Sequence, residues 1–267
     1  MTTATADTDP TVSTIEVAGT TFHVERRGSG APRLLIHGGG EDASMLAGQA
    51  EDLAAAGYEV VTYDRRGTGS SGRHDWPGEG AGQHADDAAA LLDDLAMTPA
   101  TVVGVSSGGV IALELAARHP ADVARVVAWE PPAAGILPDG VAATAAIMAP
   151  VDAYLTDHPD DFVGAQALLL SAILGVPVTA DDPAFAAARV NAEPMIRDEP
   201  QITLATFTAA DLADVDATIG IGSTPNELVA GAVERLSQVL GRPPVEVDAG
   251  HEVYLADPTV LTAIVAT

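Results

Sequence analysis

The chain contains no cysteine and no lysine. Without cysteine there can be no disulfide, no thiolate metal ligand and no cysteine nucleophile. All 12 basic residues are arginine, so a mechanism through a lysine Schiff base is also excluded. The acidic runs carry no histidine at the spacing of metal ligands. We therefore expect neither a metal nor another cofactor.

Positive charge is scarce, because 12 arginines stand against 38 acidic residues and the formal net charge is -26. Nucleic acid and anionic membranes repel such a chain, so we expect neither as a partner. No apolar run approaches the roughly 18 residues of a membrane-spanning helix. Residues 1–10 lack the basic and apolar regions of a signal peptide and are predicted to be a short disordered lead-in. We expect a cytoplasmic monomer or homodimer that acts on a small molecule.

What is present is an alternation of short apolar strands and helices. Strands are predicted at 33–36, 58–63, 100–103, 123–129, 217–222 and 245–248, after an edge hairpin at 13–26. The pattern predicts an α/β fold, with a mostly parallel sheet and helices on both faces. The alternation stops between Ala133 and Leu212, where prolines divide an apolar segment into short helices. We therefore predict a core of residues 1–132 and 213–267 and an inserted helical cap of residues 133–212.

The motif Gly104-Val105-Ser106-Ser107-Gly108 lies between an apolar strand and a predicted helix. G-x-S-x-G at such a junction is typical of a strained elbow that exposes the serine hydroxyl at the carboxyl edge of a sheet. A side chain in place of either glycine would collide with the neighbouring strand or helix. Ser106 is therefore the candidate nucleophile.

A serine hydroxyl needs a base to take its proton. Among seven histidines, His251 is the best candidate, because it follows Gly250 directly after the last predicted strand. His37 is a rival, but its setting in His37-Gly38-Gly39-Gly40 indicates a turn that presents backbone N–H groups. The remaining histidines lie in predicted strands, helices and loops without such a setting.

The base needs a carboxylate to orient it. Glu130 follows the strand next to the one that carries the serine, so it lies at the same sheet edge and is our candidate. Glu227 is the alternative, since it is the sole acid in the loop after the 217–222 strand. A capping box of Thr224-Pro225-Asn226-Glu227 explains Glu227 structurally.

The tetrahedral intermediate needs N–H donors, and we predict the backbone of Ser107 and of Gly39. Gly38, Trp129 and Pro131 are predicted to contact the substrate. The polar loop at 64–72 lacks the lysine of a phosphate-binding loop, so we interpret it as structural. Asp86 and Asp87, on a predicted helix at 83–97, are interpreted as a solvated face.

Four ordered motifs resemble those of the α/β-hydrolases that carry a cap: 37–40, 63–72, 104–108 and 250–251. The chain departs from many members, which place an Asp after the strand that matches 217–222. A Glu after the preceding strand resembles the haloalkane dehalogenases and the fungal zearalenone lactonases. The dehalogenases use an Asp nucleophile, whereas the lactonases use Ser-His-Glu. Local resemblance to the lactonases extends over 129–132, 222–227 and His251 with Tyr254.

The resemblance implies a serine hydrolase that cleaves an ester or lactone, with Ser106, His251 and Glu130 as its triad. Apolar residues of the predicted cap favour an apolar substrate. Cofactor-free perhydrolysis, C–C bond hydrolysis and non-catalytic binding of a small molecule on the same scaffold remain alternatives.

Overall fold

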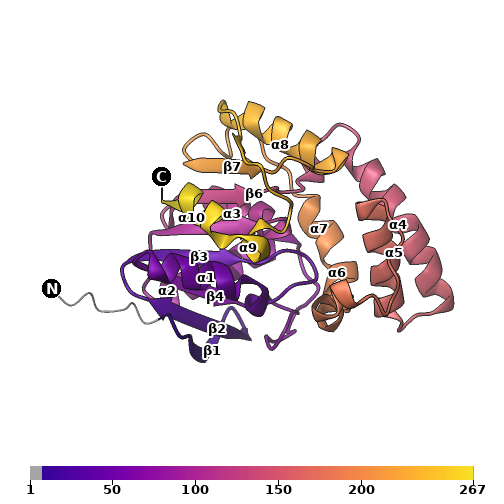
Figure 1. The fold of residues 1–267 in the computed structure, drawn as a ribbon, viewed down its shortest axis with the longest axis horizontal. Coiled ribbons are helices and arrows are strands. Elements are labelled where there is room, and N and C mark those ends of the chain that lie inside the picture. Colours follow the sequence, from indigo (N-terminus) through magenta and orange to yellow (C-terminus); the bar gives the residue numbers. More distant parts are fainter. Residues whose placement is uncertain (1–7, 267) are drawn as a thin grey trace.

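A computed structural model describes residues 8–266. Residues 1–7 of the predicted lead-in lie outside the described residues. An eight-stranded sheet forms the centre of the fold, in the order β1-β2-β4-β3-β5-β6-β7-β8 (Figure 1). The strands are β1 (Thr11–Val17), β2 (Thr20–Gly28), β3 (Ala31–Ile36), β4 (Tyr58–Tyr63), β5 (Ala100–Val105), β6 (Val123–Trp129), β7 (Ala217–Ile221) and β8 (Val245–Glu246). β1 and β2 pair antiparallel, β2 also pairs antiparallel with β4, and the other neighbours are parallel.

Helices cover both faces of the sheet, as an α/β fold requires. Buried side chains of α2 (Ala81–Asp94), α3 (Ser107–Arg118) and α8 (Glu227–Leu240) pack in one apolar cluster with the strands. On the other face pack η1 (Ala43–Leu46), α1 (Ala47–Ala55), α9 (Val253–Ala256) and α10 (Pro258–Val265). The predicted fold class is confirmed.

The segment between β6 and β7 is helical and stands at one end of the sheet (Figure 1). It has an apolar core of its own, which includes Val151, Leu169, Met195 and Ile196. Its elements are η2 (Ala134–Ile136), α4 (Gly140–Asp157), α5 (Phe162–Leu174), η3 (Pro183–Phe185), η4 (Ala187–Asn191), α6 (Ala192–Arg197) and α7 (Glu199–Thr203). Pro150 lies inside α4 and does not end it, so prolines divide this segment less than the sequence indicates.

Two local predictions are wrong. The N-cap of α8 is Asn226, whose side chain accepts a hydrogen bond from the Val229 N–H at 2.9 Å; Glu227 is the first helical residue and makes no capping box. Asp87 is buried in an ion pair with Arg66, which comes from the 64–72 loop and needs a counter-charge. Asp86 is solvated as predicted, beside Arg118. No helix between residues 8 and 266 is long and apolar enough to cross a bilayer.

Candidate active site

Ser106 occupies a sharp turn between β5 and α3. Its φ is 51°, a left-handed conformation that is strained for a residue with a side chain. The turn is tight, because a Cβ on Gly104 would lie 2.1 Å from the Gly108 carbonyl oxygen, and a Cβ on Gly108 would lie 2.2 Å from the Ile36 carbonyl oxygen. Both glycines are therefore sterically required, and the elbow geometry that the motif predicts is present.

Glu130 and His251 lie in direct contact. His251 Nδ1 donates a hydrogen bond to Glu130 Oε2 at 2.5 Å, and the other carboxylate oxygen accepts the Gly222 N–H at 2.8 Å. The Glu130 side chain is only 2% exposed. Since Nδ1 carries the proton in this contact, Nε2 is the basic nitrogen of His251.

The contact between nucleophile and base is open in this structure. Within residues 8–266, neither Ser106 Oγ nor His251 Nε2 makes a hydrogen bond, and the His251 side chain is 42% exposed. Catalytic hydrogen bonds are often loose in enzymes without substrate. The backbone around His251 is held, because Trp129 Nε1 donates to the His251 carbonyl oxygen at 2.8 Å.

Glu227 lies apart from this cluster. It is exposed at the start of α8, and it makes no hydrogen bond to His251 in the described part of the chain. Gly222 precedes it by five residues, and it is the Gly222 backbone N–H that reaches Glu130. The structure thus brings His251 to Glu130 and not to Glu227.

The two backbone N–H groups predicted as oxyanion donors have no acceptor in this structure. Among residues 8–266, neither the Gly39 nor the Ser107 N–H donates a hydrogen bond. The turn that carries Gly39 approaches the nucleophile closely, since a Cβ on Gly38 would lie 3.1 Å from Ser106 Cβ. Both N–H groups are free to donate, and their role as donors to an oxyanion stays a prediction.

His37 is unsuited to act as the base. It is fully buried, its Nδ1 donates to the Gly38 carbonyl oxygen at 2.8 Å, and its Nε2 accepts the Arg65 N–H at 3.2 Å. Burial, with a smaller effect of the nearby Arg65 charge, holds the pKa of His37 well below its usual range. Both nitrogens are therefore used to hold the turn in place.

Glu41 is a second buried carboxyl group at the site that the sequence analysis missed. Its Oε2 accepts the Gly38 N–H at 2.8 Å, and its Oε1 accepts the Tyr254 hydroxyl at 2.5 Å. Burial raises its pKa, although the bonds from Tyr254 and Gly38 oppose the shift. Glu41 links the 37–40 turn to the helix that follows His251. A lone acid in a glycine-rich turn carried no sequence signal for this role.

Two residues predicted to contact the substrate are buried. Trp129 is fully buried on the face of the sheet that α1 and α10 cover, because the side chains of β6 alternate between faces. Pro131 is buried too, with its Cβ 3.2 Å from where a Cβ on Gly109 would lie. Gly38 is buried too, but it borders Ser106, and its contact with substrate stays a prediction.

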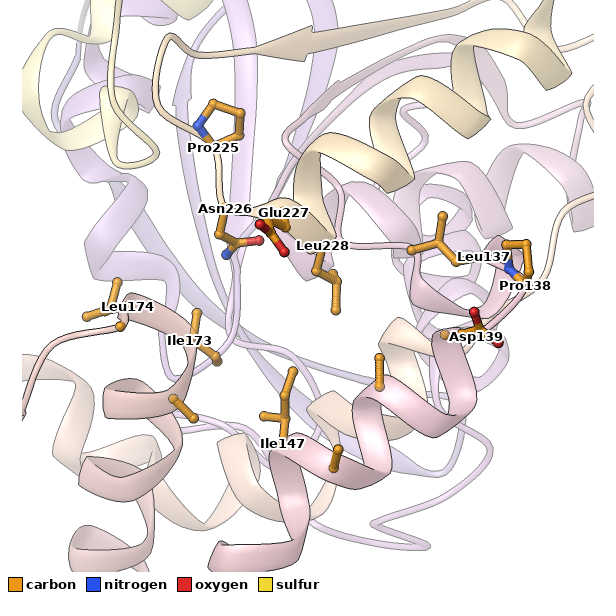
Figure 2. Close-up of a pocket in the computed structure, with 15 residues that line it drawn as sticks. Leu137, Pro138, Asp139, Ile147, Ile173, Leu174, Pro225, Asn226, Glu227 and Leu228 are labelled. Atoms are coloured by element: carbon orange, nitrogen blue, oxygen red, sulfur yellow. The ribbon is translucent and has the colours of Figure 1, made fainter.

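A cavity of about 940 Å³ lies between α4, α5 and the start of α8. Its walls are mostly aliphatic, and Ile147 and Leu228 point toward one another across it (Figure 2). Ser106 and His251 do not line it. Two of its lining residues lie in segments that follow sheet strands: Leu137 comes after β6, and Pro225 comes after β7.

Comparisons with known proteins point to the α/β-hydrolase fold. A family profile described as alpha/beta hydrolase fold matches residues 34–164. The uncharacterized hydrolase YraK of Bacillus subtilis (strain 168) is 44% identical over 119 residues, which are 44% of this chain and 44% of the relative. Rhodomycin D methylesterase DauP of Streptomyces sp. (strain C5) is 43% identical over 93 residues, 34% of this chain and 31% of the relative. The chain thus matches less than half the length of each of these two relatives.

Solved structures match over more of the chain. The crystal structure of an alpha/beta hydrolase from Sphaerobacter thermophilus DSM 20745 covers 94% of this chain and 100% of its own, with a TM-score of 0.70. The sequence identity is 24%, so this likeness concerns the fold.

Proposed function

Because the chain belongs to the α/β-hydrolase superfamily and places Ser106, His251 and Glu130 at one sheet edge, we propose that it cleaves carboxylic esters or lactones of largely apolar small molecules. The observation that carries the proposal is the Glu130–His251 contact beside a serine at a φ of 51°. Hydrolase chemistry is common to the relatives, whereas the ester or lactone substrate is our inference.

The geometry supports an acyl-enzyme mechanism. His251 Nε2 takes the proton from Ser106 Oγ as this oxygen attacks the acyl carbon, and Glu130 stabilises the imidazolium that forms. The N–H groups of Gly39 and Ser107 hold the negative oxygen of the tetrahedral intermediate. His251 then gives the proton to the leaving alcohol, and water releases the acid by the same steps. In a lactone the alcohol and the acid leave as one molecule.

The apolar cavity supports the substrate class. The cavity is lined in part by segments that follow β6 and β7, the two strands that come after β5 in the sheet order. An ester whose carbonyl lies at Ser106 can reach it with an apolar group of several carbons. The DauP relative is by name a methylesterase. A zearalenone-type lactone is one member of this class to include in a substrate panel.

The experiment compares wild type with Ser106→Ala on p-nitrophenyl esters and lactones, and a fluorophosphonate probe reports the reactive serine. We expect Ser106→Ala to abolish turnover and labelling while circular dichroism stays unchanged. Ser70→Ala, an exposed serine in the 64–72 loop, is the matched control and should behave as wild type. Unchanged turnover in Ser106→Ala would contradict the proposal. Failure of the probe to label folded wild type would instead favour a binding protein.

A further inference from the structure

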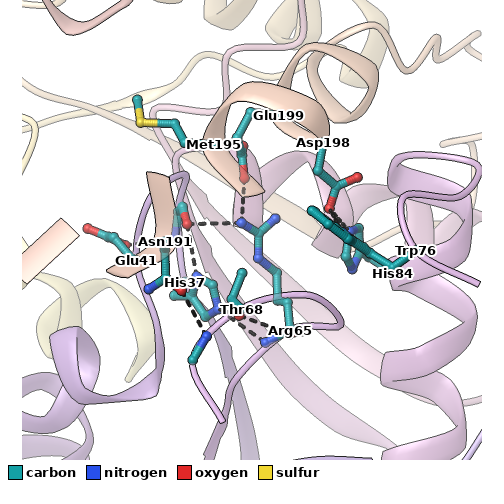
Figure 3. A network of polar contacts seen from close by, with 12 residues as sticks. His37, Glu41, Arg65, Thr68, Trp76, His84, Asn191, Met195, Asp198 and Glu199 are labelled. Carbon is teal, nitrogen blue, oxygen red and sulfur yellow. Dashed lines mark hydrogen bonds and ion pairs between the residues drawn. The ribbon is translucent and has the colours of Figure 1, made fainter. Parts of the chain in front are cut away.

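The peptide that joins Gly38 to Gly39 is held from its carbonyl side. The Gly38 oxygen accepts two hydrogen bonds, from His37 Nδ1 at 2.8 Å and from Arg65 Nη2 at 3.1 Å (Figure 3). In a trans peptide the C=O and the following N–H point in opposite directions. Fixing the Gly38 oxygen therefore fixes where the Gly39 N–H points.

We propose that Arg65 is a positioning residue for the oxyanion hole: its guanidinium aims and polarises the Gly39 N–H through the Gly38 carbonyl. Arg65 is 1% exposed and carries its charge into the interior of the protein. A hydrogen bond from a charged donor is roughly twice as strong as one between neutral groups. The neutral His37 cannot supply this effect alone.

The cap supplies the counter-charge. Arg65 Nη2 also donates to a carboxylate oxygen of Glu199, the first residue of α7 (Figure 3). This carboxylate packs against the oxyanion turn, because a Cβ on Gly39 would lie 2.9 Å from Glu199 Cδ. An unpaired negative charge there would oppose the oxyanion, and Arg65 neutralises it. The Arg65 guanidinium therefore contacts both α7, through Glu199, and the oxyanion turn, through the Gly38 oxygen.

The opposite edge of the turn is fixed as well, since the Gly38 N–H donates to Glu41. Both polar groups of Gly38 are thus engaged, whereas the Gly39 N–H is left without an acceptor among residues 8–266. Arg65 has no assigned role in the triad or among the oxyanion donors, and the polar loop at 64–72 that carries it was expected to be purely structural.

A purely structural reading is that the Arg65–Glu199 pair only fastens the cap. The two readings differ in what removal of the guanidinium does once Glu199 is neutral. We therefore compare Glu199→Gln with the double variant Arg65→Met/Glu199→Gln, because the double variant leaves no unpaired buried carboxylate. Arg118→Met, which removes an exposed arginine paired with Asp86, is the control for loss of an arginine.

Relative to Glu199→Gln, the double variant should lose about 10- to 100-fold in kcat on a p-nitrophenyl ester, with KM within about threefold. Inhibition by phenylboronic acid should weaken by a similar factor, because Ser106 Oγ adds to boron and the anionic adduct uses the oxyanion hole. Equal kcat in the two variants, a loss confined to KM, or unchanged boronic acid affinity would overturn the proposal.

If the double variant does not fold, Arg65→Lys is compared with wild type, since it keeps a charge beside Glu199. The lysine ammonium is compact and lacks the planar fork with which the guanidinium contacts both Gly38 and Glu199. The variant should therefore lose kcat and boronic acid affinity together, and a loss of kcat alone would overturn the proposal. The inference rests on the proposed function, but the two fail differently. An inactive wild type refutes the function, whereas an active wild type with insensitive Arg65 variants refutes only the role of Arg65.

Discussion

Glu130 Oε2 accepts a hydrogen bond from Nδ1 of His251, a residue 121 positions away in the sequence. Three features hold the carboxylate there. The strand β6 ends at Trp129, so Glu130 begins the turn; its φ of 44° bends the chain out of the sheet; and the Gly222 N–H fixes its second oxygen. The contact is therefore built into the carboxyl ends of two neighbouring strands, β6 and β7.

This contact predicts which acid activity requires. Glu130→Gln should lower kcat by about 10³- to 10⁴-fold on p-nitrophenyl esters, because an amide can stabilise neither the correct tautomer nor the imidazolium. Glu227→Gln is the matched change in an exposed side chain, and it should leave kcat within about twofold. Comparable losses in both variants would contradict the assignment, and so would a loss in Glu227→Gln alone.

The sequence was sufficient to predict the sheet and the elbow, because both depend on local patterns. The segment Val123–Trp129 is an apolar, β-branched run with no competing period, and the structure has a strand with these bounds. The tight turn at Ser106 was predictable because only glycine fits at Gly104 and Gly108. Each signal was contained within about ten residues.

The errors concern residues whose partners are distant in sequence. From the sequence alone, Asp87 is interpreted as one of several acids on a helix surface, and only the fold brings Arg66 into contact with it. Trp129 reads as a candidate wall of a substrate pocket, because its side of the sheet depends on which helices cover each face. Arg65 and Glu199 are separated by 134 residues, so no spacing rule indicates their contact.

The buried Trp129 predicts a link between the sheet and the base. Trp129→Phe removes the indole N–H that holds the His251 carbonyl oxygen, so the loop should loosen. We expect a loss of about 1–3 kcal/mol in the free energy of unfolding, together with a several-fold lower kcat. Trp76→Phe is the control, because that indole N–H donates to Asp198 instead. It should lower stability without lowering kcat, and equal kcat losses in both variants would contradict the link.

The apolar cavity predicts a dependence on chain length. Each buried methylene contributes about 0.8 kcal/mol, so kcat/KM should rise about threefold to fourfold per carbon as p-nitrophenyl acyl chains lengthen toward the cavity. Ile147→Asn, in the cavity wall, should flatten this rise while activity on the acetate persists. Val141→Asn lies on the same helix, is 67% exposed and does not line the cavity, so its profile should match wild type. A profile unaffected by Ile147→Asn would place the apolar group elsewhere.

The buried His37 predicts a pH dependence of stability. Burial and the Arg65 charge lower its pKa, so below about pH 6.5 the unfolded chain takes up a proton that the folded protein refuses. The stabilisation from neutral His37 is therefore complete above pH 6.5 and is lost as the pH falls toward the folded pKa. Urea unfolding should show wild type losing up to about 1.4 kcal/mol per pH unit more than His37→Asn in this range.

Carboxyl groups near His37 act in the opposite direction, and the comparison must separate them. Burial raises the pKa of Glu41 and of Asp64, so their contribution is present at low pH and is lost as the pH rises through the folded pKa. Both groups remain in His37→Asn, so their effect is shared and cancels in the difference between the two proteins. Above pH 7.5 the two stability curves should run parallel, which serves as the internal control. Parallel curves between pH 5 and 6.5 as well would show that His37 takes up its proton in the folded state as readily as in the unfolded chain.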